Sequence, residues 1–326
     1  MYKHTKHEMS FQELIDDIPS IGFEWHKDRL IENTKRNLDQ LKYCQSIKDI
    51  QPRPGKCLIV SAGPSLYRQR SLTKLNGYKG TMVAVDGGYI QCLKAGVIPD
   101  YIITIDPHPT RIVRWFGDPA LEENSKDDDY FERQDLDVSF RENALETNKD
   151  NIKLVDRFNQ SRLVIACSAP QNVVGRTFHM KRYWFAPLVD DPDEDGLTRQ
   201  MVDLTGVPAM NSGGTAGNCA WVFAYSVLNS KDIACVGMDY GYYMDTPLNQ
   251  TQEWNMLKDH DTPEQYFPEE EGYWGKARTS PTYSWYRQNL RDLMKANDGR
   301  ITNCTEGGLL TGFRVENRGL DEWLKS

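Results

Sequence analysis

The segment KCLIVSAGPSL, residues 56–66, indicates the fold class, because a short apolar run passes directly into a turn of glycine, proline and serine. Four consecutive apolar residues, Cys57 to Val60, are typical of a strand that is covered on both faces. The turn after them matches neither GxGxxG nor GxxxxGK[ST], the common phosphate-binding loops. The segment therefore predicts a buried strand whose carboxyl end carries an unusual turn.

The same pattern repeats further along the chain. Residues 82–85 (MVAV) and 101–105 (YIITI) are apolar runs of strand length, and helix-like segments at 68–75 and 89–95 separate the three runs. Strands that alternate with helices predict a parallel sheet with right-handed crossovers. Further strands are expected at 163–166, 183–185 and 233–237, with helices from Gly217 and over 283–295. The expected fold class is α/β, a Rossmann-like and mostly parallel sheet flanked by helices.

Residues 1–52 are expected to form a helical N-terminal prefix, because apolar residues recur there at helical spacing before the breaker Gln51-Pro-Arg-Pro-Gly55. Residues 53–326 are expected to form the main domain. Two segments interrupt it. Residues 118–151 are acidic, and they are expected to form either an insertion or lid or a solvated surface loop. Residues 242–281 are rich in aromatic residues and proline, which suits a flap. The aromatic side chains of this flap either close over a ligand or only pack against the protein. They are Trp254, Tyr266, Tyr273 and Trp274.

Composition excludes several classes of protein. A formal net charge of −8 over 326 residues argues against nucleic-acid binding, which needs a basic surface. No apolar run approaches the roughly 18 residues of a membrane span, and the polar start MYKHTKHEMS does not resemble a secretory signal. Seven scattered cysteines without a CxxC pair predict reduced thiols in a cytoplasmic protein and argue against structural zinc. Nothing in the sequence indicates the oligomeric state.

Polar or glycine-rich residues follow several of the expected strands. The carboxyl ends of parallel strands meet at one edge of a sheet, where open α/β sheets bind their ligands. We therefore expect five segments to converge on one crevice: Ser61–Ser65, Asp86–Gly88, Asp106–Pro109, Asn211–Asn218 and Gly237–Tyr240.

Two of these segments are glycine turns that precede helices. In Gly63-Pro64-Ser65, glycine permits a close approach of the backbone to a ligand, and the amides and the Ser65 hydroxyl form a candidate anion site. The other reading is an ordinary strand-to-helix turn. Ser212-Gly213-Gly214-Thr215 follows the same logic. The candidate nucleotide- and phosphate-binding residues are Gly63, Pro64, Ser65, Asp86, Gly87, Ser212, Gly213, Gly214, Thr215 and Asn218.

Acidic residues and one histidine complete the candidate site. Asp86, Asp106 and Asp239 directly follow apolar runs, so they either contact a ligand or Mg²⁺, which favours a few carboxylates plus phosphate oxygens, or cap the next turn. His108, between two prolines, is a candidate general base or a structural histidine. Asp239 is the other candidate base.

The pair Thr305-Glu306 comes before two glycines near the C-terminal end of the sequence. Its hydroxyl and carboxylate suit hydrogen bonds to a sugar or heterocycle, and turn formation is the competing explanation. Asp106, Thr305 and Glu306 are therefore the candidate substrate contacts. Asp86 and Asp106 are the candidate metal ligands.

Four segments together resemble one superfamily in order and spacing: IVSAGPSL, AVDGGYIQCLKAGVIPDYIITIDPHP, NSGGTAGNCAWVFAYSVLNSKDIACVGMDYGY and NCTEGG. This superfamily contains the motility accessory factor (Maf) flagellin glycosyltransferases and the MptE-like 6-hydroxymethyldihydropterin pyrophosphokinases. The resemblance spans residues 56–312.

The resemblance implies a transferase with a small-molecule nucleotide donor and a hydroxyl acceptor. In the glycosyltransferase branch the donor is a CMP-linked nonulosonic, sialic-acid-like sugar, with Gly63, Pro64 and Ser65 at the nucleotide and residues 212–215 in the same crevice. In the pyrophosphokinase branch Asp86 and Asp106 bind Mg-ATP. Thr104-Ile105-Asp106-Pro107-His108 lacks the second acid and the serine of the GDxDS pattern of thiamin pyrophosphokinases, which favours the glycosyltransferase. A nucleotide-binding module without catalysis is the third alternative.

Overall fold

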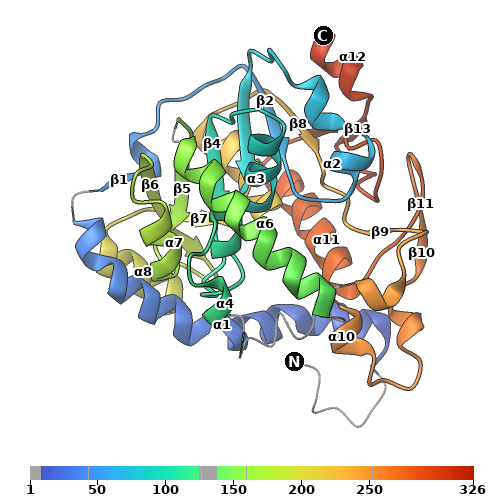
Figure 1. The fold of residues 1–326 in the computed structure, drawn as a ribbon, viewed down its shortest axis with the longest axis horizontal. Helices are drawn as coiled ribbons and strands as arrows, with labels where there is room; N and C mark the ends of the chain where they lie inside the picture. The colour runs from blue at the N-terminus through green and yellow to red at the C-terminus, as the bar shows by residue number, and fades with distance from the viewer. Residues whose placement is uncertain (1–8, 43, 125, 127–137, 159, 252) are drawn as a thin grey trace.

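The computed structural model describes residues 9–42, 44–124, 126, 138–158, 160–251 and 253–326. Within them, a ten-stranded sheet has the order β1-β6-β5-β4-β3-β2-β8-β12-β13, with β7 paired to β6 (Figure 1). Every pairing in this sheet is parallel, as the sequence predicts. The strands are β1 (Gln45–Ser46), β2 (Lys56–Val60), β3 (Thr81–Val85), β4 (Tyr101–Thr104), β5 (Arg162–Ala166), β6 (Arg182–Leu188), β7 (Ala209–Asn211), β8 (Asp232–Val236), β12 (Ile301–Asn303) and β13 (Val315–Asn317).

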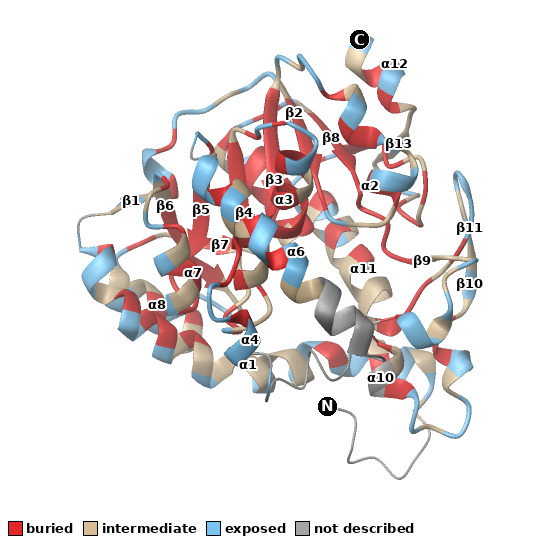
Figure 2. Cartoon of the chain, in the orientation of Figure 1, coloured by how far each residue is buried: buried red, intermediate tan, exposed pale blue. Residues whose placement is uncertain are grey.

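Helices cover both faces of the sheet, because alternate residues of each strand point into different cores. In β2, Leu58 and Val60 belong to the core with α3 and α7, whereas Cys57 and Ile59 belong to the core with α9 and α11. Figure 2 shows the central strands buried along their length. The α/β prediction is confirmed. The helices are α1 (Phe11–Leu41), α2 (Ser65–Arg68), α3 (Asp86–Lys94), α4 (Leu121–Asn124), α6 (Val138–Arg157), α7 (Gln171–Arg176), α8 (Leu197–Thr205), α9 (Ala216–Val222), α10 (Trp254–Leu257), α11 (Pro281–Ala296) and α12 (Leu320–Lys325).

The strand order reverses between β2 and β8. From β2 the chain adds β3, β4, β5 and β6 on one side, and it later returns to place β8 on the other side of β2. Ligands of such sheets bind outside the carboxyl ends of the strands near this reversal. The turns after β2, β3, β4 and β8 all lie at that edge.

The N-terminal helix α1 confirms the predicted helical segment and runs along one side of the molecule (Figure 1). A capping box between Ser10 and Glu13 starts the helix. Two buried asparagines fix it to the carboxyl edge of the sheet: Asn33 Nδ2 donates to the carbonyls of Pro107 (2.9 Å) and Ser168 (3.0 Å). Asn37 Nδ2 donates to the carbonyls of Cys167 (2.9 Å) and Ala169 (2.7 Å). The loops after β4 and β5 therefore position α1.

Residues 242–281 form a small unit of their own rather than an open loop. Strands β9 (Tyr242–Tyr243), β10 (Glu269–Gly272) and β11 (Gly275–Arg278) make an antiparallel sheet. Beside it, Leu257, Tyr266 and Phe267 form a core with Leu14 of α1. Of the 118–151 segment, the described parts contain α4 and α6, and residues 125 and 127–137 lie outside the described residues.

No helix among the described residues combines the length and the apolar character needed to cross a membrane.

Candidate functional site

A cavity of about 910 Å³ lies at the carboxyl edge of the sheet, between α1, α11 and the loops after β3, β4, β6 and β7. This volume falls within the roughly 300–1,000 Å³ that is usual for small-molecule and cofactor sites. Six of the predicted site residues line it: Asp86, Asp106, Ser212, Gly213, Gly214 and Thr215. The convergence that the sequence predicts is therefore present for the β3, β4 and β7 ends.

Asp86 lies at the base of the cavity and is 7% exposed. Its Oδ1 accepts the Gly87 amide at 2.7 Å, and its Oδ2 accepts the Thr104 hydroxyl at 3.1 Å. Burial, with a smaller contribution from the charge of nearby Asp106, raises the pKa of Asp86 to about 6, and the two hydrogen bonds and the charge of Arg114 oppose this rise. Asp86 is thus a carboxylate held in a fixed orientation beside a second one.

Asp106 shares the same wall with two arginines that the sequence analysis did not single out. Its Oδ1 accepts the amide of His108 at 2.8 Å, which shapes the turn after β4. Arg111 and Arg114, from the loop that follows, also line the cavity. The Arg114 guanidinium lies 4.4 Å from the Trp115 ring, and the Arg111 guanidinium lies 5.5 Å from the Trp25 ring of α1. Two cations and two carboxylates therefore meet at one end of the cavity, an arrangement suited to phosphate groups.

The turn Ser212–Thr215 forms another wall, next to aromatic residues of α11. Gly213 and Gly214 have φ of 57° and 86°, which favours glycine. A Cβ on Gly214 would come within 2.6 Å of the Trp285 ring. The Thr215 hydroxyl accepts the amides of Gly217 (3.0 Å) and Asn218 (3.3 Å) and thereby caps α9. The glycines thus permit close packing on α11, and the Thr215 hydroxyl already has two donors.

Asn218 has a structural role in the cavity wall and does not line the cavity. Its Nδ2 donates to the carbonyls of Gly213 (2.7 Å) and Tyr286 (2.9 Å), and its Oδ1 accepts the Tyr240 hydroxyl. This side chain is completely buried. It fixes the glycine turn to α11, so the structure favours a structural role for Asn218, and its contact with a nucleotide stays a prediction.

Helix α1 supplies a wall that sequence reasoning missed, since the N-terminal segment showed no chemistry of its own. Trp25 and His26 line the cavity, together with apolar residues of the same helix. Burial lowers the pKa of His26, and the positive charges of Arg111 and Arg29 lower it as well. The negative charge of Asp106 acts in the opposite direction. Asn33 and Asn37 lie one helical turn apart, and this spacing was the sequence signal that one face of the helix binds backbone carbonyl groups.

The Gly63 turn holds an internal carboxylate where the sequence predicts a ligand phosphate. Ser65 is completely buried, and its hydroxyl donates to Asp239 Oδ2 at 2.7 Å. The Gly63 amide donates to the Gly237 carbonyl at 2.9 Å. A Cβ on Gly63 would lie 2.0 Å from Asp239 Oδ2, so glycine is required for this contact. The structure thus gives the turn an internal role, in which it joins β2 to β8, and the nucleotide contact of Gly63, Pro64 and Ser65 stays a prediction.

The two glycine corners nevertheless lie at the same edge of the sheet. A Cβ on Gly217 of α9 would lie 3.0 Å from Ser61 Oγ, and a Cβ on Gly87 would lie 2.9 Å from Ala62 Cβ. The residues before the Gly63 turn thus pack against the first turns of α3 and α9, and the turn does not line the large cavity. Gly87 serves this packing and does not line the cavity either.

His108 is also placed away from the cavity surface. It is 6% exposed, its Nδ1 lies 3.2 Å from the Thr110 hydroxyl, and it is absent from the lining of the large cavity, to which Asp106 and Pro107 contribute. Its role as a general base stays a prediction. Its surroundings favour a structural histidine.

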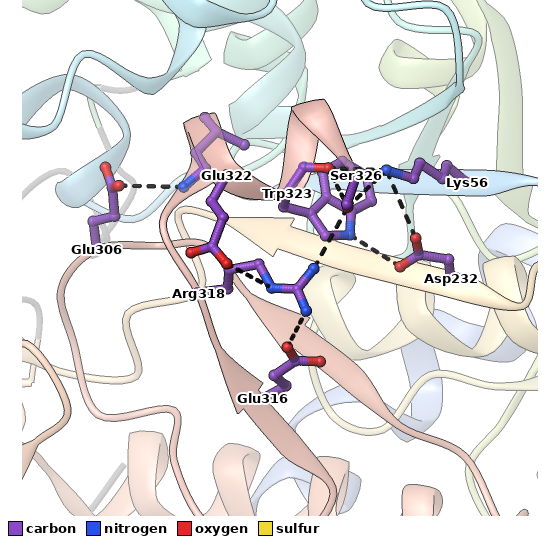
Figure 3. A network of polar contacts seen from close by, with 9 residues as sticks. Lys56, Asp232, Glu306, Glu316, Arg318, Glu322, Trp323 and Ser326 are labelled. Atoms are coloured by element: carbon purple, nitrogen blue, oxygen red, sulfur yellow. Dashed lines mark hydrogen bonds and ion pairs between the residues drawn. The ribbon is translucent and has the colours of Figure 1, made fainter.

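Asp239 and Glu306 line a second, smaller cavity of about 70 Å³. Burial raises the pKa of Asp239 to about 6, and the Ser65 hydrogen bonds oppose this. Glu306 pairs with Lys74 at 3.1 Å. Its Oε1 also accepts the Leu320 amide at 3.2 Å, which anchors the C-terminal helix α12, and Figure 3 shows Glu306 beside this helix. Thr305 is completely buried, and its hydroxyl accepts the Met238 amide at 3.3 Å. The structure thus gives Thr305 and Glu306 structural partners.

The cavity residues also bear on metal binding. Among the described residues, no group of three or more His, Cys, Asp or Glu side chains is arranged to hold a metal ion. Asp86 and Asp106 supply two neighbouring carboxylates, and Asp86 keeps lone pairs beyond its two hydrogen bonds. Two carboxylates fit a cation that draws its other ligands from substrate phosphate and water.

Comparisons with known proteins agree with this architecture. Residues 28–115 match the family described as 6-hydroxymethylpterin diphosphokinase MptE-like. A Maf glycosyltransferase structure from Magnetospirillum magneticum AMB-1 is similar in fold, with a TM-score of 0.51 and 13% sequence identity. The match covers 88% of this chain and 38% of that one, so the chain spans well under half the length of that protein. No curated protein sequence matches the chain significantly. The predicted resemblance to MptE-like proteins is confirmed over residues 28–115, and the similarity to the Maf structure is one of fold.

Proposed function

We propose that the protein is a transferase that binds a nucleotide-activated donor in the large cavity. The observation that carries the proposal is the cluster Asp86, Asp106, Arg111 and Arg114 at one end of that cavity. Arginine guanidinium groups match the geometry of phosphate oxygens. The fold, similar to that of a Maf glycosyltransferase, supports the same reaction class.

We further propose that the transferred group is a sugar, with a CMP-linked nonulosonic acid as the favoured donor. In this reaction an acceptor hydroxyl oxygen forms a bond to the anomeric carbon, and the bond from that carbon to the phosphate oxygen breaks. The nucleotide departs with the bonding electrons, and Arg111 and Arg114 stabilise its phosphate charge. Asp106 accepts the hydroxyl proton, because it lines the cavity and the sequence-predicted bases His108 and Asp239 do not.

One observation favours a second candidate, diphosphate transfer from ATP to a pterin-like alcohol. The matched family segment, residues 28–115, contains both cavity carboxylates and both cavity arginines. In that reaction Asp86 and Asp106 hold Mg²⁺, which supplies charge neutralisation for the phosphate oxygens. A binding module without turnover remains the third candidate. For all three we propose a cytoplasmic location, supported by seven unpaired cysteines.

Calorimetric titration with CMP, ATP and ATP plus Mg²⁺ tests the assignment. We expect saturable CMP binding that Arg111→Ala and Arg114→Ala weaken at least about tenfold, because each removes a charged partner of phosphate. Arg199→Ala, an exposed arginine on α8, is the control and leaves binding unchanged. Binding of ATP only with Mg²⁺, lost in Asp86→Asn, would instead establish the diphosphokinase. Donor hydrolysis separates an enzyme from a binding module.

A further inference from the structure

The smaller cavity has features of a binding site that the proposed nucleotide chemistry does not use. It lies between the β8 loop, the turn at Glu306–Gly308 and the tip of the β10–β11 hairpin. Asp239 and Tyr243 line it from the segment after β8, and Trp274 lines it from the hairpin. Tyr242 lines both this cavity and the large one, so the two cavities are neighbours.

A buried carboxylate oxygen in this cavity has no hydrogen-bond partner. Asp239 is 4% exposed, and Ser65 fixes its Oδ2 at 2.7 Å. Its Oδ1 meets no hydrogen-bond donor among the described residues. A buried acceptor without a donor costs free energy, so such atoms in native proteins are usually satisfied by water or by a ligand. The cavity therefore presents an acceptor for an incoming donor group.

An exposed aromatic pair stands at the rim. Trp274 is 39% exposed and Tyr273 is 61% exposed, and their rings meet edge to face with centroids 4.8 Å apart. A large apolar ring beside a polar cavity offers a flat surface for the C–H face of a ligand. The combination calls for a ligand with both an apolar face and hydroxyl donors.

The charged side chains around the cavity are mostly paired with one another. Arg68, which lies over the Tyr243 ring at 4.1 Å, pairs with Asp245 at 2.9 Å. Of the residues that line the cavity, Lys276 pairs with Glu271 at 3.5 Å and Glu306 pairs with Lys74 at 3.1 Å. Asp239 disfavours an anionic ligand by charge repulsion. A neutral ligand rich in hydroxyl groups satisfies Asp239 Oδ1 and needs no further counter-charge.

We propose that this cavity is a carbohydrate-binding subsite, in which a neutral pyranose stacks on Trp274 and donates a hydroxyl hydrogen bond to Asp239 Oδ1. The small volume admits one hydroxyl-bearing edge of the ring, and the remainder lies on the exposed indole. Binding here needs no occupied nucleotide cavity and no group transfer. The inference therefore stands apart from the proposed function, and its failure leaves that function untouched.

Saturation-transfer difference NMR on the full chain tests the subsite. The probes are the methyl pyranosides of glucose, galactose and mannose, with glucuronate and glucosamine as charged analogues. We expect at least one neutral pyranoside to give saturable transfer to its ring C–H protons, and both charged analogues to bind more weakly. Trp274→Ala, an exposed change that leaves the fold intact, weakens binding at least about tenfold.

Two further variants make the result specific. Phe178→Ala removes an exposed aromatic side chain that is absent from the lining of both cavities and leaves binding unchanged. Asp239→Asn, checked for folding by its thermal transition, weakens binding without abolishing the transfer to C–H protons. Absence of saturable binding by every neutral pyranoside, or equal binding by Trp274→Ala and wild type, overturns the proposal and leaves the cavity to ordered water.

Discussion

At the scale of single residues, the contact between Gly63 and Asp239 explains the turn that first indicates the fold. Ser65 of this turn lies 174 residues from Asp239, so no local pattern in the sequence reveals the pairing. The sequence correctly requires glycine for a close approach. The sequence analysis predicted a ligand phosphate at this turn, where the structure has the carboxylate of Asp239. A phosphate and a carboxylate are both anions and accept hydrogen bonds from the same donors.

Gly63→Ala tests this contact. The added Cβ would lie 2.0 Å from Asp239 Oδ2 and 2.5 Å from the Gly237 carbonyl oxygen, so strands β2 and β8 must shift apart. We expect a loss of unfolding free energy of about 1–3 kcal/mol or more, measured by urea denaturation. Gly55→Ala, with nothing within 4 Å of its Cβ, is the matched control and should change stability by less than about 1 kcal/mol. Equal stability of the two variants contradicts the steric explanation.

Asp239→Asn tests the buried charge through its pH dependence. The pKa of Asp239 is raised from 3.8 to about 6, so between these values the folded protein binds the proton more tightly than the unfolded chain. The contribution of Asp239 to the free energy of unfolding is therefore full at low pH and falls as pH rises through that window. The stability of the asparagine variant relative to wild type should increase between pH 4 and pH 7 by at most roughly 3 kcal/mol.

Urea denaturation of both proteins at several pH values gives this difference directly, and the other titrating groups cancel in it. A difference between Asp239→Asn and wild type that stays constant from pH 4 to pH 7 shows that the carboxylate is not desolvated as described.

At the scale of elements, the strands were predictable and the wall made by α1 was not. Runs such as 82–85 and 163–166 are apolar without interruption because helices cover both faces of the sheet, and that signal is local. Helix α1 instead places polar Asn33, Thr34 and Asn37 in its buried face. Apolar periodicity is therefore weak, and the carbonyls that these asparagines bind belong to loops more than 70 residues away.

Asn37→Asp tests the docking of α1. The change keeps the shape of the side chain and removes both donors, so a carboxylate faces the carbonyls of Cys167 and Ala169. We expect a loss of about 2–4 kcal/mol in unfolding free energy, from two buried hydrogen bonds and an unpaired charge. Hydrogen exchange should rise over residues 11–41, and CMP binding should weaken because α1 is a wall of the cavity.

Asn76→Asp, at an exposed position, is the matched control and should leave both measurements unchanged. Unaltered exchange over α1 in Asn37→Asp would falsify the role given to the two asparagines.

At the scale of the whole molecule, the sheet brings distant turns to one edge but divides them between two cavities. The acids after β3 and β4 and the turn at Ser212–Thr215 reach the large cavity, whereas Asp239 and Glu306 reach the small one. The sequence predicted the shared edge, since this follows from parallel strands alone. It did not predict the division, because the contacts of the Gly63 turn with Asp239 and of Ser61 with the start of α9 join residues that are far apart in the sequence.

The location of a bound nucleotide tests the central claim most directly. We predict that a crystal structure of the protein with CMP shows the phosphate between Asp106, Arg111 and Arg114, and the nucleoside along the wall made by α1 and Ser212–Thr215. Nucleotide density at the Gly63 turn in place of the Asp239 carboxylate, or outside the large cavity altogether, contradicts the account.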